Sequence, residues 1–373
     1  MSAPWPTLPF DKAVEDASGG NIKTKQNDYA EAGEFPIVDQ GRALIAGYTD
    51  DEAALCKAPL PVVIFGDHTR CLKFVDFPFG MGADGVKVLK PKAGLDAKFL
   101  YHYLRQIKLP DGGYDRHFKY LKRETVPLPP LEEQRRIAAI LDQAETLRTQ
   151  RRTALALLDS LTQSLFLDMF GDPVTNPKKL PLFRGDEICS RITVGIVVQP
   201  SSYYRSEGVP ALRSLNIRPN KVVMENLVYF SSEDNETKLA KTRVRQGDVL
   251  LVRTGQPGTA AVVPPELDGV NAIDILIATP DTSKVSADYL CYFFNSDAGK
   301  KLVLGAQRGQ VQKHLNVGAM NAALIPIPPL PLQQTFATRI ASIEALKATH
   351  RRALAALDAL FASLQQRAFT GAL

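Results

Sequence analysis

A long internal repeat is the feature that most limits how this chain can fold. Residues 127–170 recur 199 positions later as residues 326–369, without a gap. With the residue before each copy included, 18 of 45 aligned positions are identical. A repeat of this length indicates that one supersecondary unit is used twice. The 373 residues are therefore divided into two repeated segments, 127–171 and 326–373, each of which follows a longer segment, 1–126 and 172–325 respectively.

The repeated segments predict two long helices that pack against each other. Each begins with a Pro-x-Pro-Pro-Leu run, whose prolines fix φ and hold the preceding residues in extended geometry. Apolar residues then recur every three or four positions over some four heptads, which is typical of a coiled coil. About 40 residues at 1.5 Å each give a helix of about 60 Å, which needs a partner. We expect the copies to pair head to tail through a seam of Ile137, Ile140, Leu147, Arg151, Leu158 and Leu165 in the first and Phe336, Ile343, Leu346, His350, Leu357 and Leu364 in the second.

One polar position interrupts this seam. Arg151 and His350 occupy the same place in the two copies, near the middle of each predicted helix. A polar residue at a seam position commonly fixes the register of a coiled coil at some cost in stability. The alternative is a direct contact of Arg151 with DNA or with a partner subunit.

The two longer segments predict domains of one common design. In each, short β-like runs alternate with glycine-bearing turns and precede a short amphipathic helix, expected at residues 99–104 and 289–294. The β-like runs include residues 62–65 and 86–89 in the first segment and 249–252 in the second. The predicted fold class is α+β: two mixed α/β domains separated by two long antiparallel coiled-coil helices, with a pseudo-two-fold internal repeat.

Basic and amide-bearing side chains collect in the turns of both predicted domains. These side chains can hydrogen-bond base edges in the major groove, and glycine lets the backbone approach phosphate. Any single polar turn is more often plain solvated surface. Several such turns in two matched domains, however, indicate a DNA-binding surface. The candidate DNA-contacting residues are Lys23, Lys25, Gln26, Asn27, His68, Arg70, Lys87, Arg116, His117 and Lys119 in the first domain and Arg213, Asn216, Arg218, Arg253, Thr254, Gln256, Arg308, Gln310, Gln312 and Lys313 in the second.

Charge and motifs favour a binding protein over a catalyst. The net charge of +5 permits a nucleic-acid partner without requiring one. Residues 1–126 carry 17 basic and 17 acidic side chains, and residues 172–325 carry 18 and 15, so an anion-binding face needs a local arrangement. The sequence contains no nucleotide-binding glycine motif and no cysteine or histidine pair at metal-ligand spacing, and its four cysteines are expected to be reduced. With neither a membrane-length apolar run nor a signal peptide, we expect a cytoplasmic protein without a membrane partner.

At this point the organisation resembles the specificity (S) subunit of type I restriction–modification systems. Two stretches carry the resemblance most clearly: Leu-Pro-Pro-Leu-Glu-Glu-Gln at residues 128–134 and its second copy at 327–333, each followed by a long predicted helix. Residues 247–251 (Gly-Asp-Val-Leu-Leu), Gly309-Gln310 and Leu315-Asn316 add to it. The second copy departs from the pattern, because Pro331-Leu332 stands where the first copy has Glu132-Glu133.

The resemblance implies that each α/β domain is a target-recognition domain for one half of a split DNA sequence, with the helices as spacers. It further implies that two methyltransferase subunits and two restriction subunits assemble on the chain. S-adenosylmethionine would then bind the methyltransferases, and ATP with Mg²⁺ the restriction subunits, leaving no cofactor, metal or catalytic residue in this chain. Two other hypotheses stay open: a coiled-coil scaffold that binds proteins without reading DNA sequence, and a self-sufficient DNA-modifying enzyme.

Overall fold

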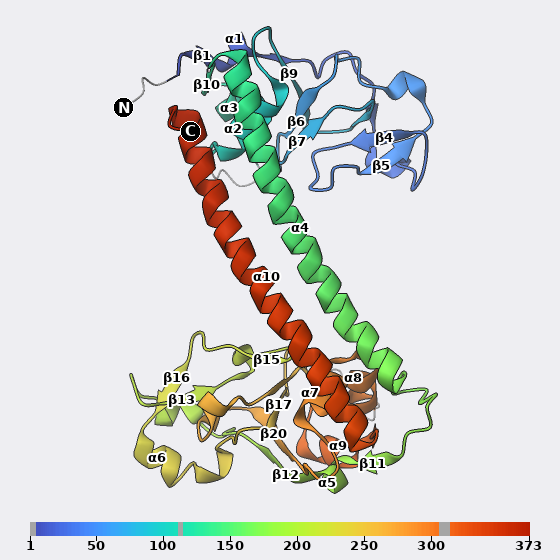
Figure 1. Ribbon diagram of the computed structural model, residues 1–373, viewed down its shortest axis with the longest axis vertical. Helices are drawn as coiled ribbons and strands as arrows, with labels where there is room; N and C mark the ends of the chain where they lie inside the picture. The colour runs from blue at the N-terminus through green and yellow to red at the C-terminus, as the bar shows by residue number, and fades with distance from the viewer. Residues whose placement is uncertain (1–4, 111–114, 306–313) are drawn as a thin grey trace. The chain divides into compact units, whose positions relative to one another are not determined.

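The computed structural model describes residues 5–110, 115–305 and 314–373, and its chain forms two compact units. The first unit comprises Met1–Thr153 with His350–Leu373, and the second comprises Ala154–Thr349. Each unit holds one α/β domain together with parts of both long helices, α4 (Leu131–Phe170) and α10 (Leu330–Thr370) (Figure 1). The division between the units therefore falls inside both helices. Within the described residues, no helix is both long and apolar enough to cross a membrane.

The α/β domain of the first unit is built on two four-stranded sheets. One is wholly antiparallel, in the order β2-β9-β6-β7, and the other, in the order β3-β8-β4-β5, contains two parallel pairs. A separate pair, β1 with β10, brings the start and the end of the domain together. The bounds are β1 (Thr7–Pro9), α1 (Phe10–Ala13), β2 (Val14–Asp16), β3 (Lys23–Thr24), β4 (Phe35–Val38), β5 (Gly47–Thr49), β6 (Val62–Gly66), β7 (Leu72–Val75), β8 (Gly80–Gly82), β9 (Val86–Pro91), α2 (Ala97–Gln106), α3 (Phe118–Leu121) and β10 (Thr125–Pro127).

The domain of the second unit repeats this plan. Its antiparallel sheet has the order β12-β20-β17-β18, its second sheet the order β16-β13-β19, and β11 pairs with β21 as β1 does with β10. The bounds are β11 (Leu182–Arg184), α5 (Gly185–Ile188), β12 (Cys189–Val194), β13 (Val209–Leu212), β14 (Ile217–Arg218), β15 (Lys221–Val222), β16 (Val228–Phe230), α6 (Ser232–Glu236), β17 (Val249–Val252), β18 (Ala260–Val262), β19 (Asn271–Ala272), β20 (Ile275–Pro280), α7 (Ala287–Asn295), α8 (Asp297–Leu304), α9 (Val317–Ala322) and β21 (Leu324–Pro326).

The predicted fold class is confirmed. The β-like runs expected at residues 62–65, 86–89 and 249–252 are the strands β6, β9 and β17. The two expected amphipathic helices are α2 and α7. Each of these helices buries its apolar face between the antiparallel sheet of its domain and a long helix, so that sheet, short helix and long helix share one hydrophobic core in each unit.

A buried glutamine joins the proline run, the long helix and the short helix at the same place in both units. In the first unit the Gln134 side chain accepts from the backbone N–H of Asp96 (2.8 Å) and donates to the carbonyls of Gly94 (2.8 Å) and Pro129 (2.8 Å). Asp96 is in turn the N-cap of α2. An amide side chain suits this place because it can accept and donate at once.

Gln333 makes the equivalent contacts in the second unit. It accepts from the backbone N–H of Ser286 (2.7 Å), the N-cap of α7, and donates to the carbonyls of Lys284 (3.1 Å) and Pro328 (2.7 Å). Both glutamines are fully buried. The glutamine of the repeated motif is therefore a structural clamp, which explains why it recurs in both copies although the two residues before it differ.

The two long helices run antiparallel within each unit. In the first unit Arg148 Nε of α4 contacts Asp358 Oδ1 of α10 at 2.6 Å, and Arg151 Nη1 lies 3.3 Å from His350 Nδ1. In the second unit Lys347 Nζ of α10 contacts Asp159 Oδ1 of α4 at 2.8 Å. Arg151 and His350 thus meet each other, which supports the interpretation that this polar pair fixes the register.

The seam differs from the predicted one at two positions. Leu147 and Leu346 are 41% and 47% exposed, and the neighbouring Arg148 and Lys347 occupy the seam in their place. Ile140 is partly buried, and Leu141 beside it is fully buried. The remaining residues of the predicted seam are buried or partly buried: Ile137, Arg151, Leu158, Leu165, Phe336, Ile343, His350, Leu357 and Leu364.

Arg148 and Lys347 can occupy the seam because a long aliphatic stem buries while its charged end reaches a carboxylate. The Arg148 guanidinium also lies over the Phe361 ring, 4.3 Å from its centroid. The Lys347 ammonium contacts Glu344 (2.8 Å) in addition to Asp159, and these two carboxylates raise its pKa against the opposing effect of burial. A pattern search restricted to apolar residues therefore selects the wrong neighbour at these positions.

Candidate nucleic-acid interface

In the first unit, backbone hydrogen bonds bring three of the sequence-predicted loops to one edge of the domain. The loop that contains Lys23 and Lys25 is held through the N–H of Ala83, which donates to Thr24 O at 2.7 Å. The turn after Ala83 contacts the loop between β6 and β7, because Asp67 N–H donates to Gly85 O at 2.7 Å. The same loop contacts the segment that contains Arg116, since His117 N–H donates to Asp67 O at 2.8 Å.

This edge exposes most of the cationic and amide side chains that were selected in the first domain. Arg70 has a left-handed backbone, with φ 60°, which sharpens the turn between β6 and β7. Gln40, from the loop between β4 and β5, lies against the same turn. Its backbone carbonyl accepts a hydrogen bond from Thr69 Oγ1 at 2.5 Å. The exposed members are Lys23, Lys25, Gln26, Asn27, Arg70, Arg116 and Lys119, and His68 is half-buried.

Several cations of the first unit are paired inside the domain. Lys119 Nζ contacts Asp115 Oδ2 at 2.8 Å, and hydrogen bonds from Lys119, the Arg116 backbone and Tyr120 lower the pKa of Asp115 to about 2. Lys87 contacts Asp16 at 3.4 Å and lies over the Phe118 ring. The positive charges of Lys119 and Lys87 are therefore partly neutralised by these carboxylates, which a count of basic residues does not show.

In the second unit the corresponding loops meet around Asp274. Arg253, at the start of the β17–β18 hairpin, contacts Asp274 Oδ1 at 2.5 Å. The preceding residue, Ile273, donates its N–H to Leu212 O at 2.8 Å, which places the loop that begins at Arg213 beside the hairpin. Arg218, Thr254 and Gln256 are exposed on these loops. Arg308, Gln310, Gln312 and Lys313 lie outside the described residues.

Four of the candidate DNA-contacting residues have side chains that are buried or bonded within their own domain. Asn216 is fully buried, where it accepts from Arg213 N–H (2.9 Å) and donates to the carbonyls of Val223 and Glu225, so it shapes its loop. His117 is only 1% exposed, inside the first domain.

The guanidinium groups of Arg253 and Arg213 are likewise engaged within the second domain. Arg253 Nε donates to Leu315 O at 3.1 Å while the same group contacts Asp274, and its side chain is 14% exposed. Arg213 donates through Nη2 to Asn226 O. Residue type alone selected these four, and type does not fix the direction in which a side chain points.

Two further stretches lie on the same edges but outside the sequence-predicted set. The loop after β12 in the second domain occupies the place of the Lys23–Asn27 loop in the first, yet it was not selected because it carries valines and serines. Its tip is exposed at Val197 and Val198. In the first domain, Asp84 is exposed in the turn between β8 and β9, with φ 54°. Aligning the order of the elements, rather than residue types, would have found both.

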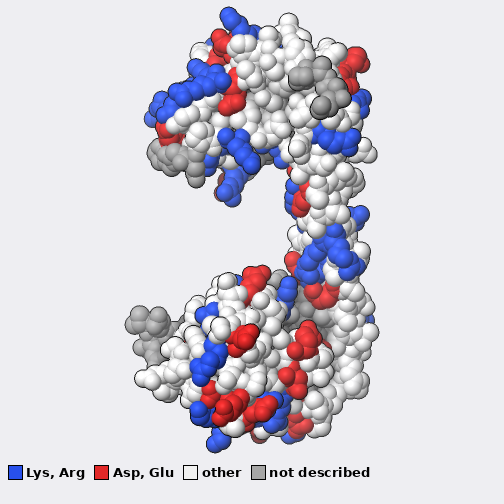
Figure 2. All heavy atoms as spheres, turned by 90° about the vertical axis from the view of Figure 1, so that its left-hand side faces the viewer, with Lys and Arg blue, Asp and Glu red and all other residues white. Residues whose placement is uncertain are grey.

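The charges differ between the two domains. Figure 2 shows groups of Lys and Arg side chains over the α/β part of the first unit and a more even mixture with Asp and Glu over that of the second. Arg205 and Lys238 of the second domain, for example, both pair with Asp234, at 3.4 and 2.8 Å. On the face that Figure 2 shows, the described residues of both units mix basic with acidic side chains, so phosphate contacts on this face would come from a few cations in each.

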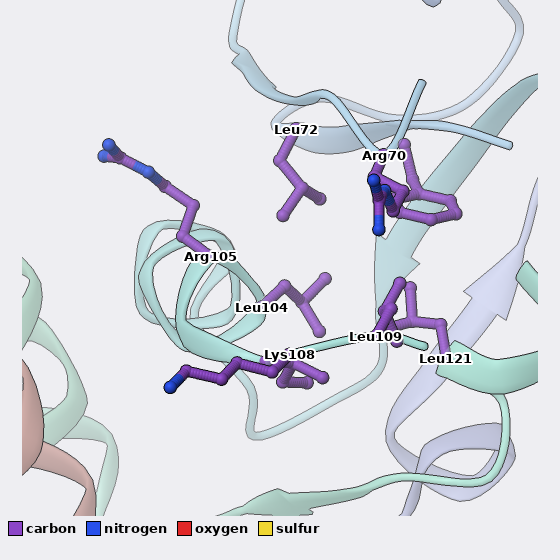
Figure 3. A pocket seen from close by; sticks show the side chains of 9 residues that line it. Arg70, Leu72, Leu104, Arg105, Lys108, Leu109 and Leu121 are labelled. Atoms are coloured by element: carbon purple, nitrogen blue, oxygen red, sulfur yellow. The ribbon is translucent and has the colours of Figure 1, made fainter. Parts of the chain in front are cut away.

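A hollow of about 320 Å³ lies beside the Arg70 turn. Its walls include Leu72, Leu104 and Leu121, and Figure 3 shows the Arg105 side chain, on α2, pointing away from it. Arg70 and Lys108 also belong to its lining, so the wall of the hollow is partly apolar and partly basic. The described residues contain no group of three or more His, Cys, Asp or Glu that could hold a metal ion.

Comparison with known proteins finds a matching domain model and similar specificity subunits. Residues 16–156 match the family model described as the type I restriction modification DNA specificity domain. The chain is 25% identical over 252 residues to the type I restriction enzyme MjaVIII specificity subunit of Methanocaldococcus jannaschii, covering 61% of this chain and 57% of that protein. It is 22% identical over 314 residues to the EcoBI specificity subunit of Escherichia coli, covering 74% and 65%. The match thus spans between about half and two thirds of these relatives' length.

Solved structures agree in fold. The S subunit of a type I restriction–modification system from M. genitalium superposes with a TM-score of 0.61 at 14% identity, over 98% of this chain and 96% of that one. A chain from a type I R-M system superposes with a TM-score of 0.57 at 18% identity, over 100% and 99%. These structures therefore share the fold of this chain. The matched domain and the relatives named above make the chain similar to type I restriction–modification specificity subunits.

Proposed function

We propose that this chain is the DNA sequence-specificity subunit of a type I restriction–modification complex, in which each α/β domain reads one half of a split target. One observation supports this proposal most strongly. The same frame of antiparallel sheet, short helix and long helix occurs twice, and it presents loops of different chemistry at the same edge. A duplicated frame supplies two readers of similar geometry, and different loops let the two half-sites differ.

Two readers on one chain suit a split DNA target for a physical reason. Readable faces of the major groove recur about every 34–36 Å, so the readers must be held at a defined distance and helical phase. Two individually weak readers also gain from effective concentration when a linker lets both engage at once. The continuous helix α4, of 40 residues, is the kind of linker that fixes such a distance.

The long helices also offer a surface for two partner subunits. Leu147 and Leu161 of α4 are exposed, and so are Leu346 and Leu360 at the equivalent positions of α10. Each copy of the repeat thus exposes two leucines at the same positions outside the seam. Two equivalent apolar surfaces suit two identical partners. We propose that two methyltransferase subunits, which bind S-adenosylmethionine, dock here, and that two restriction subunits, which bind ATP and Mg²⁺, join them in the cytoplasm. In this proposal the chain itself performs no catalysis.

A domain exchange tests this function. The sequence methylated in cells that carry the complete system is first mapped, which gives both half-sites and their spacing. Replacing residues 1–126 with the corresponding domain of another specificity subunit should then change one half-site and preserve the other half-site and the spacing. A change in both halves would overturn the two-reader proposal.

A binding assay separates this function from the two remaining hypotheses. With the methyltransferase present, the mapped duplex should bind more tightly than random duplexes, and the affinity should fall with added salt. A protein-binding scaffold would show neither a sequence preference nor a salt dependence. Transfer of labelled methyl groups from S-adenosylmethionine to DNA by the purified chain alone would indicate a self-sufficient enzyme instead.

A further inference from the structure

The loop after β12 exposes two adjacent apolar side chains at its tip. Val197 is 51% and Val198 is 74% exposed, and Gln199 beside them is exposed with a left-handed backbone, φ 42°. Burying a valine side chain typically stabilises a fold by about 1.5–3 kcal/mol relative to leaving it exposed. Two neighbouring valines that the domain leaves uncovered are therefore available to a partner.

The tip is presented by a firmly anchored loop. On one side, Ile196 is buried, its N–H donates to Ala272 O at 2.8 Å, and its carbonyl accepts from Asp274 N–H at 3.1 Å. On the other side, the Tyr203 and Tyr204 rings pack against Phe230, each 6.2 Å between centroids. Since both ends are fixed in the core, the exposed valines hold a defined position and do not have to order on binding, which lowers the entropic cost of a contact.

The surroundings of the tip indicate what it contacts. Ile196 is bonded to the turn of Asp274, the same turn that holds Arg253 and the Arg213 loop, so the valines belong to the edge that carries the candidate DNA-contacting loops. In the first domain Thr24 pairs with Gly82 as Ile196 pairs with Ile273 here, and the next two residues, Lys25 and Gln26, are exposed. The same place in the two domains thus presents a cation and an amide in one and two apolar side chains in the other.

We propose that Val197 and Val198 are specificity-determining residues that recognise thymine through its C5-methyl group in the major groove. This inference rests on the proposed function, because it assigns a base to one of the two readers. Thymine alone among the four bases presents a methyl group in that groove, and an apolar side chain is the partner that distinguishes it. Lys23 and Lys25 of the first domain cannot make this contact and suit phosphate or guanine acceptors instead.

Substitution of deoxyuridine for thymidine tests the proposal, because it removes only the methyl group. Duplexes of the mapped target are prepared with every thymine of the second domain's half-site replaced by uracil, and separately with those of the first domain's half-site replaced. Binding is measured with the full chain and its methyltransferase. The first duplex should bind about fourfold more weakly for each methyl contacted, equivalent to about 0.8 kcal/mol at 1.4 kcal/mol per factor of ten.

The protein variant Val198→Thr is the matched partner of this DNA change, because it replaces one methyl group with a hydroxyl at nearly constant volume. It should bind the thymine duplex more weakly than the wild type does and the uracil duplex equally well. The same variant should respond like the wild type to uracil in the first domain's half-site. Circular dichroism confirms that the exposed substitution leaves the fold intact.

The outcomes separate this inference from the proposed function. Equal binding of thymine and uracil duplexes, a half-site without thymine, or a Val198→Thr defect that is the same on both duplexes would each overturn the thymine contact while sequence-specific binding persists. A Val198→Thr defect confined to methyltransferase assembly would assign the valines to a protein partner and overturn it too. Absence of any preference for the mapped target would instead remove the proposed function.

Discussion

The two units use one frame but fasten the α/β domain to the long helices with different chemistry. The sixth residue of the short helix is His102 in the first unit and Tyr292 in the second. His102 Nε2 lies 2.6 Å from Asp142 Oδ1 of α4, and Lys98 contacts the same carboxylate. Tyr292 packs instead on Phe336 of α10, 5.3 Å between ring centroids.

This difference shows which features of the frame are interchangeable. Asp142 has Ala341 at the equivalent position of the second copy, so the polar joint was not duplicated. The glutamine clamp, in contrast, is made in both units with the same three types of bond. Backbone hydrogen bonding fixes the path of the chain, whereas the side chains that fill the joint can be either charged or aromatic.

The largest effect should come from the aromatic joint. The Phe336 ring lies within 6 Å of the rings of Phe166, Phe170 and Tyr292, and Phe336→Ala would leave a cavity among them. We expect a loss of about 3–5 kcal/mol in the free energy of unfolding of the second unit. Ile137→Ala, at the equivalent position of the first unit, should cost less because fewer aromatic contacts are lost.

Two probes report the units separately in this experiment. The only tryptophan of the sequence, Trp5, belongs to the first unit, where its indole N–H donates to Ala368 O at 3.2 Å. Its fluorescence follows the first unit, and hydrogen exchange in α7 follows the second. If Phe336→Ala shifted the Trp5 transition as much as the exchange of α7, the units would not be energetically distinct and the comparison would fail.

The sequence determines the frame of this protein better than it determines the contacts. The repeat and the order of strands and helices follow from periodicity and turn residues, which are local properties. The seam at Arg148 and Lys347 does not, because an apolar pattern cannot tell that a long charged side chain will bury its stem. Asn216 and Val198 show the same limit at the reading edge: the polar residue is inside, and the apolar residue is outside.

The glutamine clamp should show equal effects in the two units. Gln134→Ala and Gln333→Ala each remove three hydrogen bonds and leave buried backbone groups without a partner. At about 1–3 kcal/mol for a buried unpaired group, with partial relief by water, we expect a loss of about 2–3 kcal/mol in each unit. Gln143 of α4 and Gln334 of α10 are exposed, and their substitution by alanine provides controls that should change the free energy of unfolding little. A large loss in one unit alone would mean that the clamp is equivalent in geometry but not in energy.

The polar joint of the first unit should give the smallest effect and the only one that depends on pH. Burial alone would raise the pKa of Asp142, but hydrogen bonds from His102 and Lys98 outweigh it, so the pKa lies below its usual value of 3.8. A carboxyl group with a lowered pKa stabilises the folded state above its unfolded pKa, and this contribution is lost as the pH falls through the folded value. Asp142→Asn should therefore destabilise the first unit at neutral pH.

The expected size is small because Asp142 remains partly exposed and solvent screens the interaction, which leaves about 0.5–1 kcal/mol. Urea unfolding followed by Trp5 fluorescence should show this difference between wild type and Asp142→Asn at pH 7, and the difference should shrink below about pH 4. Lys98 and His102, which contact Asp142, and Tyr101, Arg105 and Glu145, which also line this joint, keep their identity in the variant. Asp28→Asn, at an exposed carboxylate of the same unit, should show no such convergence. A difference that grew on acidification would mean that Asp142 is held in its neutral form, and the two joints would then differ in shape but not in charge.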